Sequence, residues 1–401
     1  MVSNQFVSVT TSGDRLKILF LAPQPFYQER GSPIANDMVL QVLSARSEEV
    51  DVVTYSEGVD VYYDQIDLYR IKKLAFLANI KPGFSWQKII CDFLMVLKVI
   101  PLILRKRYHL VHAVEESVFI ALVLKILLNI PYIYDMDSSI PEQMVEKYPK
   151  LAKISFFLDF WEKIAVKNAQ VVVPVCQAIA NRIARYQPTR VELIPDVSLL
   201  KERKTTKIEN LRQELNLTGQ ILMYVGNLES YQGIDLLLDS MAMVCQQTED
   251  LNLVIIGGDP DDIAKYQQQA QTLGITAKVH FIGMRSPKLL DQYLQQADIL
   301  VSPRIKGKNT PMKIYSYLDS GKPVVATDLA THTQVIEAGT TILAAPEKEG
   351  FAEGILTLTQ DKNLQRKIGQ AGKQLIQAKY TPQVFQRKFN RLYDSLKAQL
   401  L

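Results

Sequence analysis

Short runs of β-branched and apolar residues recur along the chain, and most are followed by a stretch with helical spacing. Such alternation predicts βαβ units around a parallel sheet that is buried on both faces. Strands are expected at 17–22, 50–55, 110–113, 132–136, 171–175 and 191–195, and again at 221–226, 253–257, 279–283, 299–303 and 324–327. Helices are expected at 116–128, 234–245 and 287–297. The pattern therefore predicts an α/β fold of two doubly wound, Rossmann-like lobes.

With 401 residues, the chain is too long for one ordinary core and long enough for two lobes. A polar, lysine-rich segment without a strand pattern begins near residue 198. We expect a flexible N-terminus at 1–15, a first lobe at 16–198, a second lobe at 199–380 and a final helix at 381–401 that packs against the first lobe. Two such lobes place the functional cleft between them, at the carboxyl ends of their strands.

Charge and cysteine content exclude several classes of protein. A net charge of +4 argues against a dedicated nucleic-acid binder. The three cysteines, Cys91, Cys176 and Cys245, are far apart and form no CxxC pair, so neither a metal nor a redox site is expected. No apolar leader opens the sequence, and charged residues and a proline interrupt the most apolar stretch, 89–104. We expect a cytoplasmic protein without a transmembrane segment.

The turn after the first predicted strand could hold an anion. Arg30, Gly31 and Ser32 lie there, and Ser32 is expected to cap a helix whose first residue is Pro33. Glycine lets the backbone approach a ligand, and a helix N-terminus favours a negative charge. An ordinary strand-to-helix turn explains this single glycine equally well.

The second half of the chain opens with a similar glycine-containing turn between a strand and a helix. The strand expected at 221–226 ends in Gly226 and Asn227, and Gln232 and Gly233 stand at the start of the next helix. Backbone N–H groups can meet a phosphate at such a place. The repetition strengthens the interpretation of both turns as phosphate-binding loops.

A basic loop follows the strand expected at 299–303. Arg304, Lys306, Lys308 and Lys313 supply four cations within ten residues, and Thr310 is expected to cap a helix that begins at residue 311. Cations beside the exposed N–H groups of a helix start form a suitable cradle for a diphosphate. We favour this interpretation over a merely solvated loop.

Polar residues also follow two strands of the first half. His112 and Glu116 lie at the end of the strand expected at 110–113, and Asp137 and Ser138 follow the strand expected at 132–136. At strand ends that face the expected cleft, such groups could orient or deprotonate a hydroxyl. Asp137 is the leading candidate for a catalytic carboxylate and His112 the second, although a lone histidine is more often structural and Glu116 could simply cap a helix.

With these motifs, the chain resembles the family 4 glycosyltransferases of the GT-B fold, also described as glycosyl transferases group 1. The resemblance runs over about 16–395 and rests on LFLAP at 19–23, YVGN at 224–227, ADILVSP at 297–303 and SGKPVVAT at 320–327. It implies transfer of a sugar from a nucleotide donor, a UDP- or GDP-sugar, to a hydroxyl of a glycan, lipid or small molecule. It also implies retention at the anomeric carbon and no metal or other cofactor, with the donor on the second lobe and the acceptor on the first.

The chain departs from the family pattern at the donor contacts. Asn227 and Gln232 stand where the family has an arginine and a lysine that touch the diphosphate. Lys308 and Ser316 stand where it has paired glutamates. We therefore expect that positive charge has moved to the 304–313 loop, that Lys313 is the main diphosphate ligand, and that Ser316 still reaches the ribose. A further family residue, a histidine, maps to Asp137.

Two alternatives to an active transferase stay open at this point. The altered contacts also fit a non-catalytic GT-B protein that binds a sugar nucleotide or glycan, and the fold also fits a sugar-nucleotide epimerase.

Residues 88–107 combine apolar residues with five cations, and relatives that glycosylate lipids dock on membranes through such surfaces. A buried helix with a charged end is the favoured interpretation, and Pro101 predicts that it is split into two short helices. Contact with the inner face of a membrane is the alternative.

Overall fold

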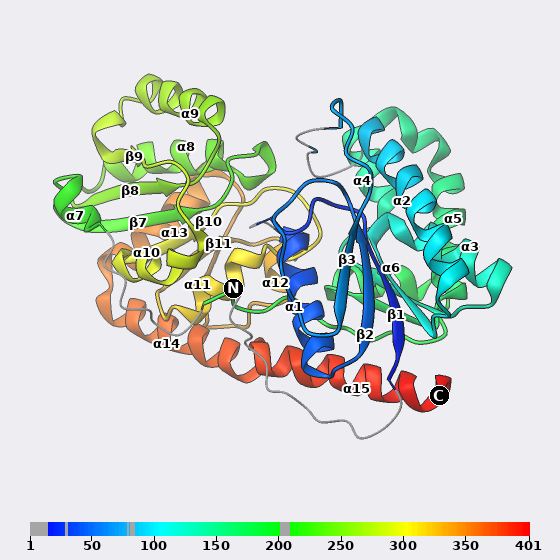
Figure 1. Cartoon of the computed structure of the whole chain (residues 1–401). Coiled ribbons are helices and arrows are strands. Elements are labelled where there is room, and N and C mark those ends of the chain that lie inside the picture. Colours follow the sequence, from blue (N-terminus) through cyan, green and yellow to red (C-terminus); the bar gives the residue numbers. More distant parts are fainter. Residues whose placement is uncertain (1–14, 29–30, 78–79, 81–84, 201–208) are drawn as a thin grey trace. The chain divides into compact units, whose positions relative to one another are not determined.

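The computed structural model describes residues 15–28, 31–77, 80, 85–200 and 209–401. These residues form two compact units. The first unit comprises the described residues up to Asp196 together with Pro382–Leu401, and the second is Val197–Thr381. Each unit contains one parallel sheet covered by helices on both faces (Figure 1).

The sheet of the first unit has six parallel strands in the order β3-β2-β1-β4-β5-β6. The strands are β1 (Lys17–Ala22), β2 (Glu49–Thr54), β3 (Ile66–Arg70), β4 (Leu110–Val114), β5 (Tyr132–Met136) and β6 (Val171–Pro174). The order reverses direction between β1 and β4, which is the switch point where doubly wound sheets bind ligands. All residues of β4 and β6 are buried, as expected of strands covered on both faces.

Helices cover both faces of this sheet. They are α1 (Gly31–Ala45), α2 (Trp86–Arg105), α3 (Val118–Leu128), α4 (Ile140–Lys147), α5 (Ser155–Asn168), α6 (Gln177–Ala184) and α15 (Pro382–Leu400). Residues of α2, α3, α5 and α6 share one apolar core with the strands. Helix α15 contacts α1 and buries Phe385, Phe389, Leu392, Tyr393 and Leu396. It therefore closes the first unit with residues from the far end of the sequence.

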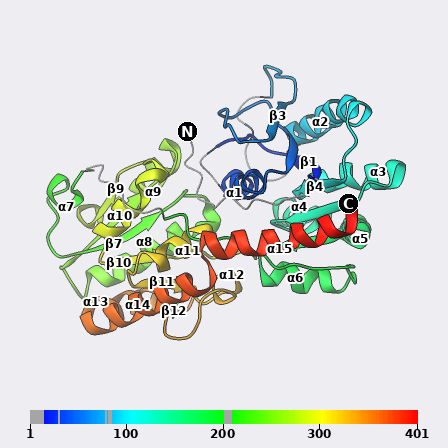
Figure 2. The same cartoon turned by 60° about the horizontal axis from the view of Figure 1, so that its bottom comes forward.

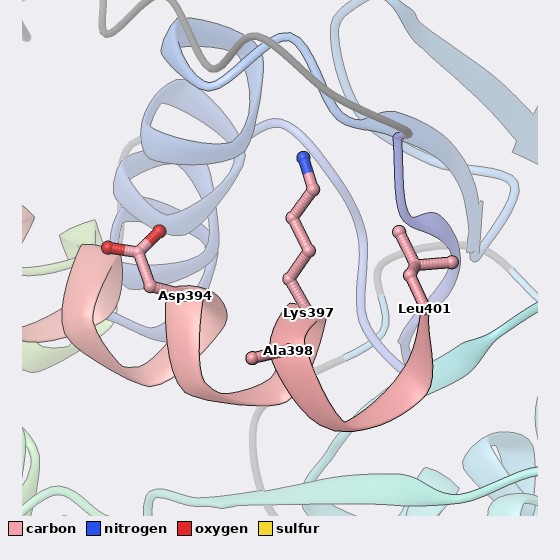
Figure 3. Close-up of a pocket in the computed structure, with 4 residues that line it drawn as sticks. All are labelled: Asp394, Lys397, Ala398 and Leu401. Atoms are coloured by element: carbon pink, nitrogen blue, oxygen red, sulfur yellow. The ribbon is translucent and has the colours of Figure 1, made fainter.

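A buried group of charges fastens α15 near the start of β2. Arg46 and Glu48 are 1% and 0% exposed, and the guanidinium of Arg46 contacts Glu48 at 3.3 Å and Asp394 at 2.8 Å. Glu48 also accepts a hydrogen bond from the backbone N–H of Leu16 at 2.8 Å and lies 3.8 Å from Lys397. Asp394 and Lys397 line an open pocket of about 400 Å³ on α15 (Figure 3). Because this pocket lies near the amino ends of β1 and β2, it is not the site expected at the carboxyl ends of the strands.

The sheet of the second unit also has six parallel strands, in the order β12-β11-β10-β7-β8-β9. They are β7 (Gln220–Val225), β8 (Leu251–Ile256), β9 (Val279–Phe281), β10 (Ile299–Ser302), β11 (Val324–Thr327) and β12 (Ile342–Ala344). The helices are α7 (Leu211–Glu214), α8 (Ile234–Cys245), α9 (Pro260–Thr272), α10 (Leu290–Gln296), α11 (Met312–Asp319), α12 (Ala330–Thr333), α13 (Lys348–Gln360) and α14 (Lys362–Lys379). The switch point lies between β7 and β10, where the strand order reverses.

The structure corrects several expectations about secondary structure. The strand expected at 191–195 is reduced to a single bridge between Val191 and Val172. Strands β3 and β12 went unpredicted because β3 is a partly exposed edge strand of mixed polarity and β12 has only three residues. Each lacks the apolar run by which a buried strand is recognised.

Three predictions about helix boundaries were also wrong. Helix α2 is continuous through Pro101, because the ring lies on its exposed side, where water can satisfy the carbonyl that loses its partner. Helix α1 already begins at Gly31, so Ser32 is not its cap. Helix α11 begins at Met312 after Pro311, and the Thr310 hydroxyl has no hydrogen-bond partner among the described residues, so Thr310 is not a cap either.

Candidate functional site

A lysine amine lies at the switch point of the second sheet. Lys313, in the first turn of α11, donates hydrogen bonds from Nζ to the Tyr224 hydroxyl at 2.7 Å and to Gln232 Oε1 at 3.1 Å. The amine also lies 3.9 Å from the centre of the Tyr224 ring. The Tyr224 hydroxyl in turn donates to the backbone carbonyl of Asn227 at 2.6 Å. The structure thus brings together Lys313, Gln232 and Asn227, which the sequence placed in two separate loops.

Arg304 adds a second, largely buried cation to this place. Its Nε donates to the carbonyl of Lys306 at 2.7 Å, its Nη2 donates to Asn309 Oδ1 at 3.1 Å, and its guanidinium lies over the Tyr231 ring. Burial, followed by repulsion from Arg304, lowers the pKa of the Lys313 amine well below its usual value. Among the described residues, no carboxylate is a cause of that shift. A buried amine whose charge no described carboxylate offsets, with the Arg304 guanidinium near it, favours the binding of an anion.

His332 holds the loop that presents Arg304. Its Nε2 lies 2.9 Å from Ser302 Oγ, and its Nδ1 lies 2.9 Å from the carbonyl of Thr327. The Thr327 hydroxyl donates to the carbonyl of Arg304 at 2.5 Å. Burial is the main reason that the pKa of His332 falls to about 4, so the ring is neutral near pH 7. We therefore regard His332 as a structural residue that the sequence analysis did not single out.

Two glycines bring backbone close to these groups. A Cβ at Gly226 would lie 2.6 Å from Lys313 Nζ, and a Cβ at Gly233, which has φ +74°, would lie 2.0 Å from the carbonyl oxygen of Pro303. Gly233 also precedes α8, so the N-terminus of that helix opens at the same edge of the sheet. Glycine at both positions is required for the close packing that defines the site.

Replacing Gly226 by alanine is expected to weaken anion binding at this site more than it reduces the stability of the fold. The new Cβ would displace the Lys313 amine, since the two cannot lie 2.6 Å apart. The matched control is Gly274→Ala, because Gly274 also has a positive φ but no atom lies within 4 Å of its Cβ position. Binding of nucleoside diphosphates measured by calorimetry should fall about tenfold or more in Gly226→Ala only. Equal losses in both variants would contradict this role of Gly226.

The remaining residues predicted for this loop lie in different surroundings. Lys306 and Lys308 are exposed, and the carbonyl of Lys308 accepts a hydrogen bond from Gln334. Ser316 is buried, and its hydroxyl accepts a hydrogen bond from the backbone N–H of Leu199 at 3.1 Å. Ser316 therefore already has a partner, and its contact with a ribose stays a prediction.

Carboxylates gather at the switch point of the first sheet. Asp137, just after β5, accepts a hydrogen bond from the Ser32 side chain, and burial followed by repulsion from Asp135 raises its pKa to about 7. Ser138 donates to Glu115 at 2.9 and 3.1 Å. Burial, followed by repulsion from Asp137, raises the pKa of Glu115 well above its usual value. The predicted residues Asp137, Ser32 and Ser138 thus lie in one acidic, partly desolvated region.

His112 lies within β4 rather than at its end, and it is fully buried. Its Nδ1 is 2.6 Å from the Tyr393 hydroxyl of α15, and its Nε2 is 3.1 Å from Asp135 Oδ2. The ring stacks on Phe20 with centroids 4.5 Å apart. This arrangement suits a residue that positions Asp135 better than one that touches a substrate, and a direct catalytic role for His112 stays a prediction.

The other residues predicted in the first unit are partly accounted for. Arg30 lies outside the described residues. The space beside Gly31 is open, with no atom within 4 Å of its Cβ position. Glu116 forms an ion pair with Lys88 of α2, so it fastens that helix to the 3₁₀ turn after β4. Among the described residues, no group of acidic, histidine and cysteine side chains is arranged to hold a metal ion.

Asp196 joins the carboxylates of the first unit, although the sequence analysis did not find it. Burial, followed by repulsion from Asp137 and Asp135, raises its pKa to about 8, compared with about 3.9 in an unfolded chain. Between these two pH values the folded protein keeps a proton that the unfolded chain releases. The free energy of unfolding should therefore fall as the pH rises from about 4 to about 8.

The variant Asp196→Asn is expected to lose part of this pH dependence. One proton contributes a slope of at most about 1.4 kcal/mol per pH unit, and the variant should gain stability relative to the wild type at pH 8. Urea unfolding at pH 5 and pH 8 measures the effect. Asp64→Asn, which changes an exposed aspartate of the same unit, is the control. A pH dependence that is unchanged in Asp196→Asn would show that Asp196 is not the buried acid described here.

Comparison with known proteins agrees with this architecture. A model of the family "Glycosyl transferases group 1" matches residues 207–375, and a model of "Glycosyltransferase Family 4" matches residues 37–196. Sucrose-phosphate synthase from Thermosynechococcus elongatus has a similar structure, with a TM-score of 0.77 and 21% identity over 96% of this chain and 100% of that one. The Anabaena HepE structure with UDP gives a TM-score of 0.73 and 16% identity over 95% and 100%.

Curated relatives match a smaller part of the chain. The phosphatidyl-myo-inositol mannosyltransferase of Mycobacterium leprae is 23% identical over 181 residues, which are 44% of this chain and 47% of that protein. The chain thus spans about half the length of such curated relatives.

Two parallel six-stranded sheets, each with an equivalent switch point, define the GT-B fold class. The two family models together cover most of the chain. The chain therefore belongs to the group 1, family 4 glycosyltransferases.

Proposed function

We propose that the protein is a retaining glycosyltransferase that moves a sugar from a nucleotide-sugar donor to an acceptor hydroxyl. One observation supports this most strongly: Lys313 and Arg304 lie together at the switch point of the second sheet, and no described carboxylate offsets the charge of Lys313. A nucleotide sugar brings a diphosphate that would neutralise Lys313 and lie beside Arg304. The family to which the chain belongs supports the same class of donor.

The donor site would hold the diphosphate against the Lys313 amine and the Arg304 guanidinium. Gln232 and Tyr224 orient the amine through the hydrogen bonds at 3.1 and 2.7 Å. The amine of Lys313 therefore lies beside the side chain of Gln232. In the family pattern, a lysine stands at the position of Gln232. We infer that the positive charge has kept its place in space while its position in the sequence has changed.

Catalysis would then rest on stabilisation of the departing diphosphate. When the bond from the anomeric carbon to the diphosphate oxygen breaks, negative charge grows on that oxygen and positive charge on the sugar ring. Preorganised cations in a site with little water stabilise the first charge strongly. Transfer to the same face of the sugar gives the retained configuration.

The acceptor would bind to the first unit, near Asp137. With a pKa of about 7, Asp137 can accept a proton from an acceptor hydroxyl or hold that hydroxyl by a hydrogen bond. Ser138, Glu116 and the 30–32 turn would contribute polar contacts. A hydroxyl on a glycan, a lipid or a small molecule fits this description. We expect the reaction in the cytoplasm.

We infer that UDP is the preferred nucleotide, with GDP as the other candidate. The structure of Anabaena HepE, which shares the fold, contains UDP. UDP and GDP differ in the base, which backbone groups of such a site recognise. The diphosphate contacts proposed for Lys313 and Arg304 are the same for both nucleotides.

The reaction is tested by incubating the protein with UDP- and GDP-sugars, with and without a panel of glycan and lipid acceptors. We expect release of the nucleoside diphosphate and a product whose anomeric proton shows, by NMR, the configuration of the donor. The replacement of the family's paired glutamates by Lys308 and Ser316 motivates a non-catalytic alternative. Nucleotide binding without turnover on any acceptor would favour that alternative, and an isomerised nucleotide sugar formed without acceptor would identify an epimerase.

A further inference from the structure

Helix α5 directs its acidic residues inward and its aromatic residues outward. Arg182 of α6 contacts Glu162 at 3.1 Å and Asp159 at 2.6 Å, and Glu162 is only 1% exposed. The opposite side of the helix exposes Phe156, Phe157, Phe160 and Trp161, with Phe156 at 73%. A helix on the surface of a soluble domain normally has the reverse arrangement.

Helix α2 shows the same inversion. Lys88 pairs with Glu116, and Asp92 accepts a hydrogen bond from the Tyr55 hydroxyl at 2.6 Å, so both charged residues face the core. Six exposed apolar residues run along the other side of all 20 residues of the helix: Trp86, Ile89, Phe93, Leu97, Ile100 and Leu104. Their spacing of three or four residues forms one continuous stripe.

Helix α3 extends the apolar surface between these two helices. It exposes Val123, Ile126, Leu127 and Leu128, and it contacts α5. The three helices share one core on the same face of the sheet, and Figure 2 shows α3 between α2 and α5. We call the exposed apolar residues of α2, α3 and α5 the apolar face. Exposed apolar surfaces of this extent mark places where another surface binds.

Lysines surround the aromatic part of the apolar face. Lys147, Lys150, Lys153, Lys163 and Lys167 are all exposed on or beside α4 and α5. The acidic residues of α5, Asp159 and Glu162, are engaged with Arg182 and do not offset this charge. Glu146 of α4 is exposed as well, so five exposed lysines outnumber this carboxylate, and the surface around the aromatic residues is positive.

We propose that the apolar face is a docking surface for a lipid bilayer that contains anionic headgroups. Aromatic residues with lysines beside them suit the boundary between acyl chains and headgroups, where rings are buried and ammonium groups stay hydrated. None of the described helices is long and apolar enough to cross a bilayer, so the contact is parallel to the surface. This inference does not depend on the proposed transfer reaction.

Tryptophan fluorescence tests the proposal directly. The chain contains two tryptophans, Trp86 and Trp161, and both lie exposed on the apolar face. With phosphatidylcholine vesicles that also contain phosphatidylglycerol, we expect a blue shift of the emission and quenching by brominated acyl chains. With phosphatidylcholine alone, we expect a much weaker response. If anionic vesicles caused no spectral change, the proposal would be overturned. It would also be overturned if the tryptophan emission changed with protein concentration in the absence of lipid, because the apolar face would then bind a second copy of the chain.

Two pairs of substitutions separate the contributions of rings and charges. Phe93→Ser with Phe156→Ser should weaken vesicle binding at least tenfold, whereas Lys163→Gln with Lys167→Gln should weaken binding to anionic vesicles by about fivefold for each lysine. Tyr62→Ser with Met284→Ser is the control, because both residues are exposed and apolar but lie outside the apolar face. Because all these side chains are exposed, the fold should be unaffected. If the phenylalanine or the lysine double variant bound anionic vesicles as tightly as the control variant, the proposal would be contradicted.

Discussion

Replacing Lys313 by glutamine is expected to weaken binding of a nucleoside diphosphate about 10- to 150-fold. Hydrogen bonds to a charged group contribute about 1.5–3 kcal/mol, and the Lys313 amine would form such a bond with the diphosphate. Glutamine keeps a polar side chain of similar length and removes the charge. Titration calorimetry with UDP and GDP measures the affinity.

Lys348→Gln is the matched control for this substitution. It removes one positive charge from the same unit, at a surface pair with Glu349 whose side chains are more than half exposed. Its affinity for the nucleotide should stay within about twofold of the wild type, because exposed charges contribute little and are screened by salt. Similar losses in the two variants would mean that net charge, rather than the position of Lys313, determines binding.

A double substitution can restore what Lys313→Gln removes. Because the Lys313 amine lies 3.1 Å from Gln232 Oε1, Gln232→Lys combined with Lys313→Gln exchanges the two side chains and keeps the charge near the same point. We expect the exchanged variant to bind at least tenfold more tightly than Lys313→Gln alone. Failure of the exchange, with the fold intact, would show that the amine must come from α11.

The second large effect concerns the buried charges beneath α15. Glu48→Ala is expected to lower the free energy of unfolding by about 3–5 kcal/mol, because it leaves the buried guanidinium of Arg46 without one of its partners. The substitution also removes the acceptor for the backbone N–H of Leu16. Both effects would loosen the contact between α15 and the start of β2.

The adjacent residue supplies the control for Glu48. Glu49 forms a pair with Lys17 at 3.6 Å, and both side chains are about half exposed. Glu49→Ala should therefore change the free energy of unfolding by at most about 1 kcal/mol. Urea unfolding of the two variants measures the difference, and equal stabilities would contradict the description of Glu48 as a buried partner of Arg46.

The sequence predicts the fold well where strands are buried on both faces. β4, β5, β7 and β10 consist mostly of buried apolar residues, and their positions agree with the prediction within a residue or so. β3 and β12 are edge strands that are partly exposed, so polar and apolar residues alternate less clearly with burial there and neither strand was predicted. The continuity of α2 through Pro101 depends on which side of the helix faces water, and the sequence alone does not give that.

The candidate site was predictable in part. Cations near a helix start indicated the 304–313 loop, and both Arg304 and Lys313 are enclosed at the switch point. The hydrogen bond between Lys313 and Gln232 joins residues 81 positions apart, so spacing could not reveal it. Asp196 was missed although it directly follows the strand expected at 191–195, because its raised pKa depends on Asp137 and Asp135, which are distant in sequence.

A crystal structure of the protein with the nucleoside diphosphate that it binds most tightly tests the central claim most directly. The account predicts a β-phosphate oxygen about 3 Å from Lys313 Nζ, with the Arg304 guanidinium beside the same diphosphate. A diphosphate bound elsewhere, with the Lys313 amine still held only by Tyr224 and Gln232, would contradict it.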